Sequence, residues 1–80
     1  MKIMSVDSSS YVLGSRILFI EGSKVYAEMT IPNISKNTIA ELAISHDVQL
    51  IILKGTNDFY KNTEKFLSDY SAQWEVQVVH

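Results

Sequence analysis

The fold of this chain is decided by the stretch Val48–Gly55, whose sequence is VQLIILKG. Five of its first six residues are apolar, and a glycine closes it. A run that is apolar on both of its alternating faces is typical of a parallel strand covered on two sides. The stretch therefore predicts a central parallel strand with helical cover on both faces.

Three strands are predicted before this stretch. Residues 2–6 alternate between apolar and polar types and stop at a polar turn that starts at Asp7, so they predict a first strand. Residues 11–21 and 24–31 are rich in β-branched and aromatic side chains. The tight turn at Gly22 between them predicts an antiparallel hairpin.

Two finer features of this hairpin follow from its sequence. Gly14, inside the second predicted strand, marks either a bulge or the close approach of another backbone segment. The third strand alternates regularly, which predicts one drier and one wetter face. The drier face is expected to carry Val25, Ala27, Met29 and Ile31, and the wetter face Lys24, Tyr26, Glu28 and Thr30.

Two amphipathic helices are predicted, one on each side of the apolar stretch. The first begins at a cap on Thr38, with Glu41 in capping-box spacing, or at the rival cap Ser35, and it ends at residue 45 or 46. The second helix follows cap candidates at residues 56–58. Its apolar stripe is Phe59, Thr63, Phe66, Leu67 and Tyr70.

The last strand and the sheet order complete the predicted fold. Residues 74–79 alternate again, with Trp74 and Tyr70 expected in the core. Residues 1–80 thus predict one α/β domain in the order β-β-β-α-β-α-β. The simplest sheet is mixed and five-stranded, in the order 3-2-1-4-5, with only the second strand antiparallel to the rest. Its crossovers are right-handed, which can place both helices on one face of the sheet or one on each face. The apolarity of residues 48–53 favours one helix on each face.

Composition narrows the classes of function. The net charge is −2 with acids and bases interspersed, so the net charge does not support a nucleic-acid partner. A local basic patch could still bind nucleic acid, so this class of partner stays open. Without cysteine the chain has no disulfide and no thiolate metal site, which fits a cytoplasmic protein. No apolar run approaches the roughly 20 residues of a membrane span, and residues 1–7 lack the apolar region of a signal peptide, so no membrane partner is expected.

The order of elements, together with residues 6–10 (VDSSS) and 52–57 (ILKGTN), resembles the ribonuclease H-like fold. The local likeness is to the Holliday-junction resolvase and putative resolvase branch. In that branch the first strand ends in an aspartate followed by small residues, beside an apolar fourth strand. The resemblance covers the first part of that fold.

This resemblance implies a divergent or truncated metal-dependent nuclease. Asp7 would be its catalytic carboxylate and a ligand of Mg²⁺ or Mn²⁺, and Asp58 is the second candidate ligand. Two-metal phosphoryl chemistry needs several carboxylates. Lys54 and Gly55 stand where a further acid of such a site would close the fourth strand. No cofactor is expected unless this nuclease function holds.

Two other functions remain open from the residues alone. Asp7 is equally a turn residue whose carboxylate accepts backbone N–H groups. A phosphate- or nucleotide-binding module would work at the carboxyl ends of the parallel strands. Its candidate ligand-binding residues are Ser8, Ser9, Thr56 and Asn57.

The remaining hypothesis is a small non-catalytic interaction domain that associates with itself or with another protein. The strand at 24–31 lies at the sheet edge in the predicted order, and an open edge favours pairing with another chain. The candidate interface residues are Tyr26, Glu28 and Tyr60, because tyrosine is enriched at interface hot spots. The small size of the domain points the same way, since association would bury more apolar surface. His46 is expected only to close the first helix.

Overall fold

The structure, a computed structural model, describes residues 1–8, 14–55, 57–70 and 73–79, and the side chains of 57–60 lie outside this description. All seven predicted elements are present in the expected order. Their bounds are β1 Lys2–Asp7, β2 Ser15–Glu21, β3 Lys24–Ile31, α1 Lys36–Ser45, β4 Leu50–Lys54, α2 Asn57–Tyr70 and β5 Glu75–Val79. Residues 11–13 of the predicted second strand lie outside the described residues.

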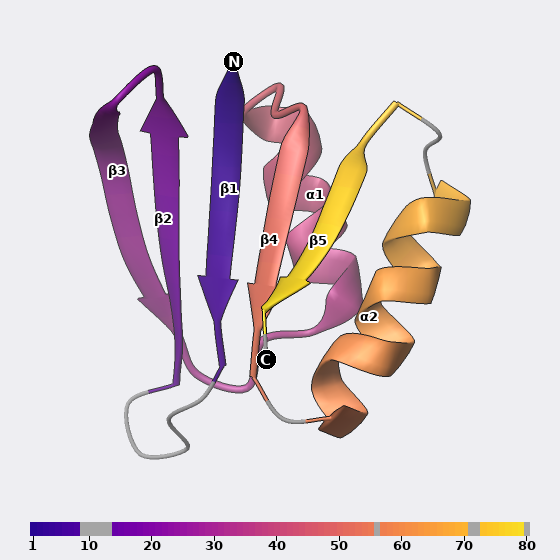
Figure 1. Cartoon of the computed structure of the whole chain (residues 1–80). Helices are drawn as coiled ribbons and strands as arrows, with labels where there is room; N and C mark the ends of the chain where they lie inside the picture. Colours follow the sequence, from indigo (N-terminus) through magenta and orange to yellow (C-terminus); the bar gives the residue numbers. More distant parts are fainter. Residues whose placement is uncertain (9–13, 56, 71–72, 80) are drawn as a thin grey trace.

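The five strands form one mixed sheet in the order β3-β2-β1-β4-β5, as predicted (Figure 1). β2 is antiparallel to both β1 and β3, whereas β1–β4 and β4–β5 are parallel pairs. The apolar stretch supplies β4, which lies between β1 and β5. The α/β fold class and the strand order are therefore confirmed.

Both helices pack against the same face of the sheet, so the expectation of one helix on each face is wrong. Leu67 of α2 belongs to one buried cluster with Ile39 of α1 and with Ile51 and Leu53 of β4. The reason is topological: the crossovers from β3 to β4 and from β4 to β5 move across the sheet in the same direction. Two right-handed crossovers in one direction place both helices on one side.

Figure 1 presents the opposite face of the sheet to the viewer. The alternate residues of each strand point toward this face. In β4 the buried Ile51 and Leu53 alternate with the half-buried Leu50 and Ile52. The apolarity of β4 on both sides is therefore real, but no described helix covers the second side. The protein is a two-layer α/β domain with a sheet face left without helical cover.

A β-bulge in the hairpin changes the predicted faces of β3. Phe19 pairs with Ala27 but the next residue, Ile20, pairs with Val25, so Tyr26 is the extra residue. The bulge shifts the alternation by one. Val25 consequently joins Ile20 on the helix-free side and is 52% exposed, whereas the ring of Tyr26 approaches Phe19 on the helix side. The predicted positions of Val25 and Tyr26 are therefore wrong.

Gly14 marks a close backbone approach, one of the two alternatives for this residue. It has φ +83°, and a Cβ added there would lie 2.9 Å from the carbonyl oxygen of Ile31. Gly22 has φ +64° in the predicted hairpin turn, and a Cβ there would meet nothing within 4 Å. Both positions need the left-handed region, but only Gly14 is also enclosed.

The first helix is capped by Ser35, the rival of the preferred cap. The Thr38 backbone N–H donates to the Ser35 Oγ at 3.2 Å, and α1 then runs from Lys36. The Thr38 hydroxyl lies 3.0 Å from the same Oγ. Thr38 is thus inside the first turn, and its prediction as the cap is wrong.

Replacing Ser35 with alanine is expected to lower the free energy of unfolding by about 1 kcal/mol, because the Thr38 N–H loses its acceptor. Thr38→Ala removes a hydroxyl and a methyl group but leaves the backbone N–H bonded to Ser35, and it should cost less. Urea unfolding of both variants, followed by far-UV circular dichroism, measures the difference. An equal or larger loss in Thr38→Ala would contradict the observed cap.

The second helix follows its predicted stripe for most of its length. Thr63 and Leu67 are buried and Phe66 is half-buried against the core. Tyr70, the last residue of α2, is 52% exposed, so its predicted core position is wrong. Trp74 is half-buried as expected. Within the described ranges, neither helix is long and apolar enough to cross a bilayer.

Candidate functional site

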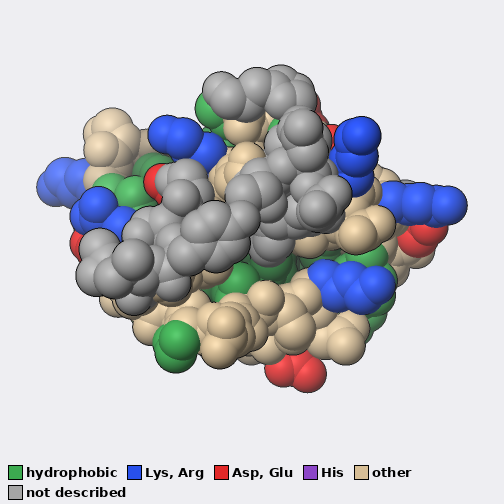
Figure 2. Space-filling model, turned by 90° about the horizontal axis from the view of Figure 1, so that it is seen from below, with side chains coloured by type: hydrophobic (Ala, Val, Ile, Leu, Met, Phe, Trp, Pro, Cys, Tyr) green, Lys and Arg blue, Asp and Glu red, His purple; other side chains and the backbone are tan. Residues whose placement is uncertain are grey.

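Asp7 lies at the carboxyl end of β1, where the resemblance and the turn hypothesis both placed it. Its cross-strand partners are Arg16 of β2 and Lys54 of β4, so the three residues form one row on the helix-free side. Figure 2 views the molecule from this end, where Lys and Arg side chains gather with Asp and Glu side chains among them. Asp7 is thus flanked by two cationic residues. This arrangement disfavours the binding of a further cation such as Mg²⁺.

Arg16 is engaged by a neighbouring carboxylate of β3. Its Nε donates to the Glu28 Oε1 at 2.8 Å, and both side chains are largely exposed. The hydrogen bond that Arg16 donates to Glu28 and the negative charge of that carboxylate, with a smaller contribution from Asp7, raise the pKa of the Arg16 guanidinium. Glu28, a candidate interface residue, is therefore held in an ion pair across the hairpin.

Ser8, the first candidate phosphate ligand, already has partners within the fold. Its backbone N–H donates to the Lys54 carbonyl oxygen at 2.7 Å, which extends the β1–β4 ladder by one residue. Its Oγ lies 2.5 Å from the Oγ of the buried Ser15. These contacts assign Ser8 a structural role at the strand end and leave its N–H unavailable to an anion.

The structure describes the other candidate ligand-binding residues only in part. Ser9 and Thr56 lie outside the described residues, and Asn57 and Asp58 are in the first turn of α2, with side chains outside the description. Across the described ranges, no group of three or more His, Asp or Glu side chains is arranged to hold a metal ion. The proposed pairing of Asp7 with Asp58 stays a prediction.

The helix-free face of the sheet presents a set of aliphatic side chains. One row across the sheet joins Val25, Ile20, Ile3 and Leu50, and the next joins Leu18, Ser5 and Ile52. We call the apolar patch formed by these two rows the helix-free patch, which consists of Ile3, Leu18, Ile20, Val25, Leu50 and Ile52. Val25 is exposed and the other five are half-buried, without helical cover. The row of Arg16, Asp7 and Lys54 borders the patch at the carboxyl end of β1.

Sequence reasoning detected these residues but misinterpreted them. Leu50 and Ile52 of this patch belong to the apolar run that was the reason for expecting a helix on each side of β4. The signal that identifies the patch is the predicted strand order itself, because both crossovers run in one direction and leave the second face bare.

The two remaining interface candidates differ in how far the structure describes them. Tyr26 is 47% exposed, and its hydroxyl lies 3.3 Å from His46 Nδ1, within hydrogen-bond distance. The His46 ring stacks on Phe19 with centroids 3.7 Å apart. Tyr26 therefore joins the hairpin to the end of α1, where His46 is the C-cap as predicted. Tyr60 lies in α2 with its side chain outside the description.

Comparison with known proteins adds no relative to these observations. No protein-family model matches the chain, and no curated protein sequence matches it significantly.

Proposed function

We propose that this chain is a small cytoplasmic interaction domain that associates with a second copy of itself through the helix-free patch. The observation that supports this proposal is the set of aliphatic side chains, interrupted by Ser5, on a sheet face without described helical cover. An apolar patch on the surface of a small protein is typical of an interaction site. The absence of cysteine from all 80 residues fits a reducing compartment.

Sheet-on-sheet packing suits the chemistry of this surface. Two such faces can interdigitate at a separation of about 10 Å, as in a β-sandwich. Each copy would then bury side chains that the monomer leaves half-exposed, at about 25 cal/mol for each Å² of apolar area. The charged row of Arg16, Asp7 and Lys54 lies at the border of the patch, where charges can stay hydrated at the rim of an interface.

The edge of β3 is the less favourable route to self-association. The bulge at Tyr26 interrupts its regular alternation, and bulges protect sheet edges from further pairing. Tyr26 and Glu28 also contact His46 and Arg16 of their own chain. These contacts favour the sheet face over the edge as the interface.

Sedimentation velocity over a concentration series tests the proposal. The wild-type chain should form a concentration-dependent dimer. Val25→Lys should raise its dissociation constant about tenfold or more, because a lysine would be buried in an apolar interface. Val25 is 52% exposed, so this change should leave the monomer folded.

The matched control is Ile44→Lys, the same kind of substitution at a side chain 55% exposed on α1. It should leave the dissociation constant unchanged, since α1 covers the opposite face. A wild-type chain that stays monomeric up to about 1 mM, or an equal effect of both variants, would contradict association through the patch.

We propose that this chain is related to ribonuclease H-like nucleases by ancestry but does not share their activity. The strand order is the one that the resemblance implied. Asp7, however, lies between Arg16 and Lys54, which weighs against metal-dependent cleavage. A Mn²⁺ titration followed by NMR tests for metal binding at Asp7, because a bound ion would broaden the amide signals around this residue.

A further inference from the structure

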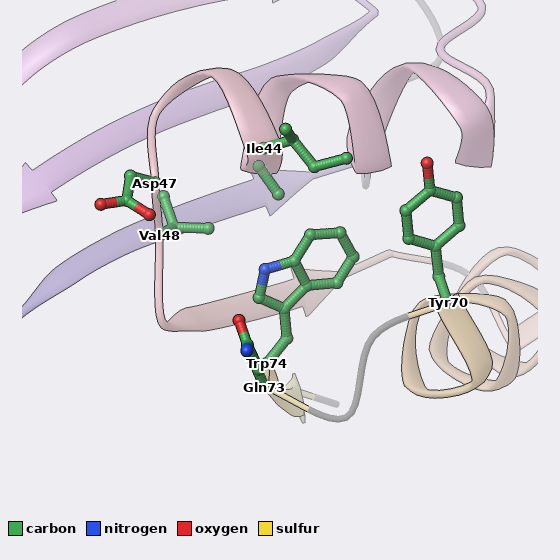
Figure 3. A pocket seen from close by; sticks show the side chains of 7 residues that line it. Ile44, Asp47, Val48, Tyr70, Gln73 and Trp74 are labelled. Atoms are coloured by element: carbon green, nitrogen blue, oxygen red, sulfur yellow. The ribbon is translucent and has the colours of Figure 1, made fainter.

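A pocket of about 330 Å³ lies where the two helices end, on the helix side of the sheet. Its described lining combines aliphatic and aromatic side chains with one charged group, and consists of Ala43, Ile44, Asp47, Val48, Tyr70, Gln73 and Trp74. Figure 3 shows the Trp74 indole between Asp47 and Tyr70, with Ile44 of α1 above it. The volume is within the range of small-ligand sites, roughly 300–1,000 Å³.

The aromatic part of the pocket is a stacked pair of parallel rings, which we call the platform. The rings of Tyr70 and Trp74 are parallel, with planes 3° apart and centroids separated by 5.6 Å. Tyr70 on one wall of the pocket is 52% exposed, and Ile44 on the opposite wall is 55% exposed. Each wall therefore presents a large apolar side chain to solvent.

Asp47 stands where a helix C-terminus usually has glycine, and its charge is unfavourable there. It ends α1 in a Schellman motif, in which the Val48 N–H donates to the Ala43 carbonyl and the Asp47 N–H to the Ile44 carbonyl, both at 3.2 Å. The residue at this position has φ +54°, where glycine is usual. A carboxylate at a helix C-terminus also opposes the helix dipole.

Both helices direct their negative ends toward this pocket. α1 ends at Ser45 with His46 as its C-cap, next to Asp47, and α2 ends at Tyr70, which lines the pocket. Neither helix has a basic residue in its last turn to compensate its dipole. Asp47 is the only charged side chain among the described lining residues. The pocket is therefore negative, and local stability alone does not explain the choice of aspartate.

We propose that this pocket binds the guanidinium group of an arginine side chain on a partner protein. A planar guanidinium can stack on the flat Trp74 face while donating two parallel hydrogen bonds to the Asp47 carboxylate. The aliphatic stem of arginine would lie against Ile44 and Val48. A compact ammonium group lacks the flat face that matches the platform.

Arg16 of the same chain does not supply the guanidinium group. Arg16 is the single arginine of the sequence, and it is held by Glu28 at 2.8 Å in the hairpin. The site is formed by the helix ends and not by the helix-free patch. The inference therefore does not depend on self-association, and the two can fail separately.

The test uses the intrinsic fluorescence of Trp74, the only tryptophan in the chain. The probe is N-acetyl-L-arginine methylamide, titrated at low salt into the full chain. It should change the emission saturably. The matching citrulline amide, which is neutral and of nearly the same shape, should bind about tenfold more weakly because it cannot form the charge-assisted pair. The matching lysine amide should also bind more weakly than the arginine amide.

Asp47→Asn is the decisive variant, because asparagine also tolerates the left-handed conformation. It should weaken arginine-amide binding about tenfold while raising the melting temperature by roughly 2–6 °C through loss of the unfavourable charge. The control Glu64→Gln makes the same charge change at an exposed position of α2 outside the pocket lining, and it should leave binding unchanged.

Three results would overturn the proposal. The first is no saturable change in Trp74 emission up to about 50 mM arginine amide. The second is equal binding of the arginine, citrulline and lysine amides, which would show that the pocket distinguishes neither the charge nor the shape of the ligand. The third is a folded Asp47→Asn variant that binds the arginine amide as tightly as the wild-type chain does.

Discussion

Replacing Ile51 with alanine is expected to lower the free energy of unfolding by about 3–4 kcal/mol, whereas replacing the adjacent Ile52 should cost only about 1 kcal/mol. Ile51 is fully buried in the cluster that both helices cover. Ile52 lies on the helix-free face and is half-buried, so its truncation leaves no enclosed cavity. The two residues are identical and neighbouring in β4, which makes each the control of the other.

The size of this difference matters because the domain is small. An 80-residue chain has a total stability of about 4–12 kcal/mol, so the Ile51 variant would retain only a narrow margin. Urea unfolding at concentrations where the chain is monomeric measures both changes. Equal losses for the two variants would mean that both sides of β4 are covered, contrary to the two-layer fold.

Substituting alanine for Gly14 is expected to cost about 3 kcal/mol, the second large effect. Its φ of +83° is strained for any residue with a side chain, and the new Cβ would lie 2.9 Å from the Ile31 carbonyl oxygen. The obstacle is backbone, so the end of β3 must move to relieve the contact. We expect a fall of about 12–24 °C in the melting temperature.

Gly22→Ala separates the two causes of this loss. Gly22 has a similar φ of +64°, but a Cβ there would meet nothing within 4 Å. Only the conformational cost of about 1 kcal/mol should remain. Thermal unfolding followed by circular dichroism measures both variants. If the two glycine variants lost the same stability, the close approach at Gly14 would have no energetic consequence.

Local sequence patterns were sufficient for the elements and for their order in the sheet. Alternation located the strands, Gly22 located the hairpin turn, and the stripe through Thr63 and Leu67 located α2. These features depend on neighbouring residues, so they can be predicted without knowledge of the tertiary fold. The α1 cap shows the limit, because Ser35 and Thr38 both satisfy the local preference and only the hydrogen bond to the Ser35 Oγ distinguishes them.

The candidate sites were less predictable, because they depend on contacts between distant residues. Asp7 was identified from its strand end, but its cationic neighbours Arg16 and Lys54 come from two other strands. The pocket was missed, since Asp47 and Trp74 are far apart in sequence and meet only where α1 and α2 end. A cue was present in Asp47, which stands where a helix C-terminus usually has glycine.

The sequence by itself determined which segments become strands and helices, because periodicity and turn residues act over a few positions. The order in which the strands pair then followed as the simplest sheet for that order of elements. Only the tertiary structure decided which side of each apolar strand is covered. An isoleucine at 51 and an isoleucine at 52 are chemically the same. The common direction of the two crossovers buries the first under both helices and leaves the second on the helix-free face.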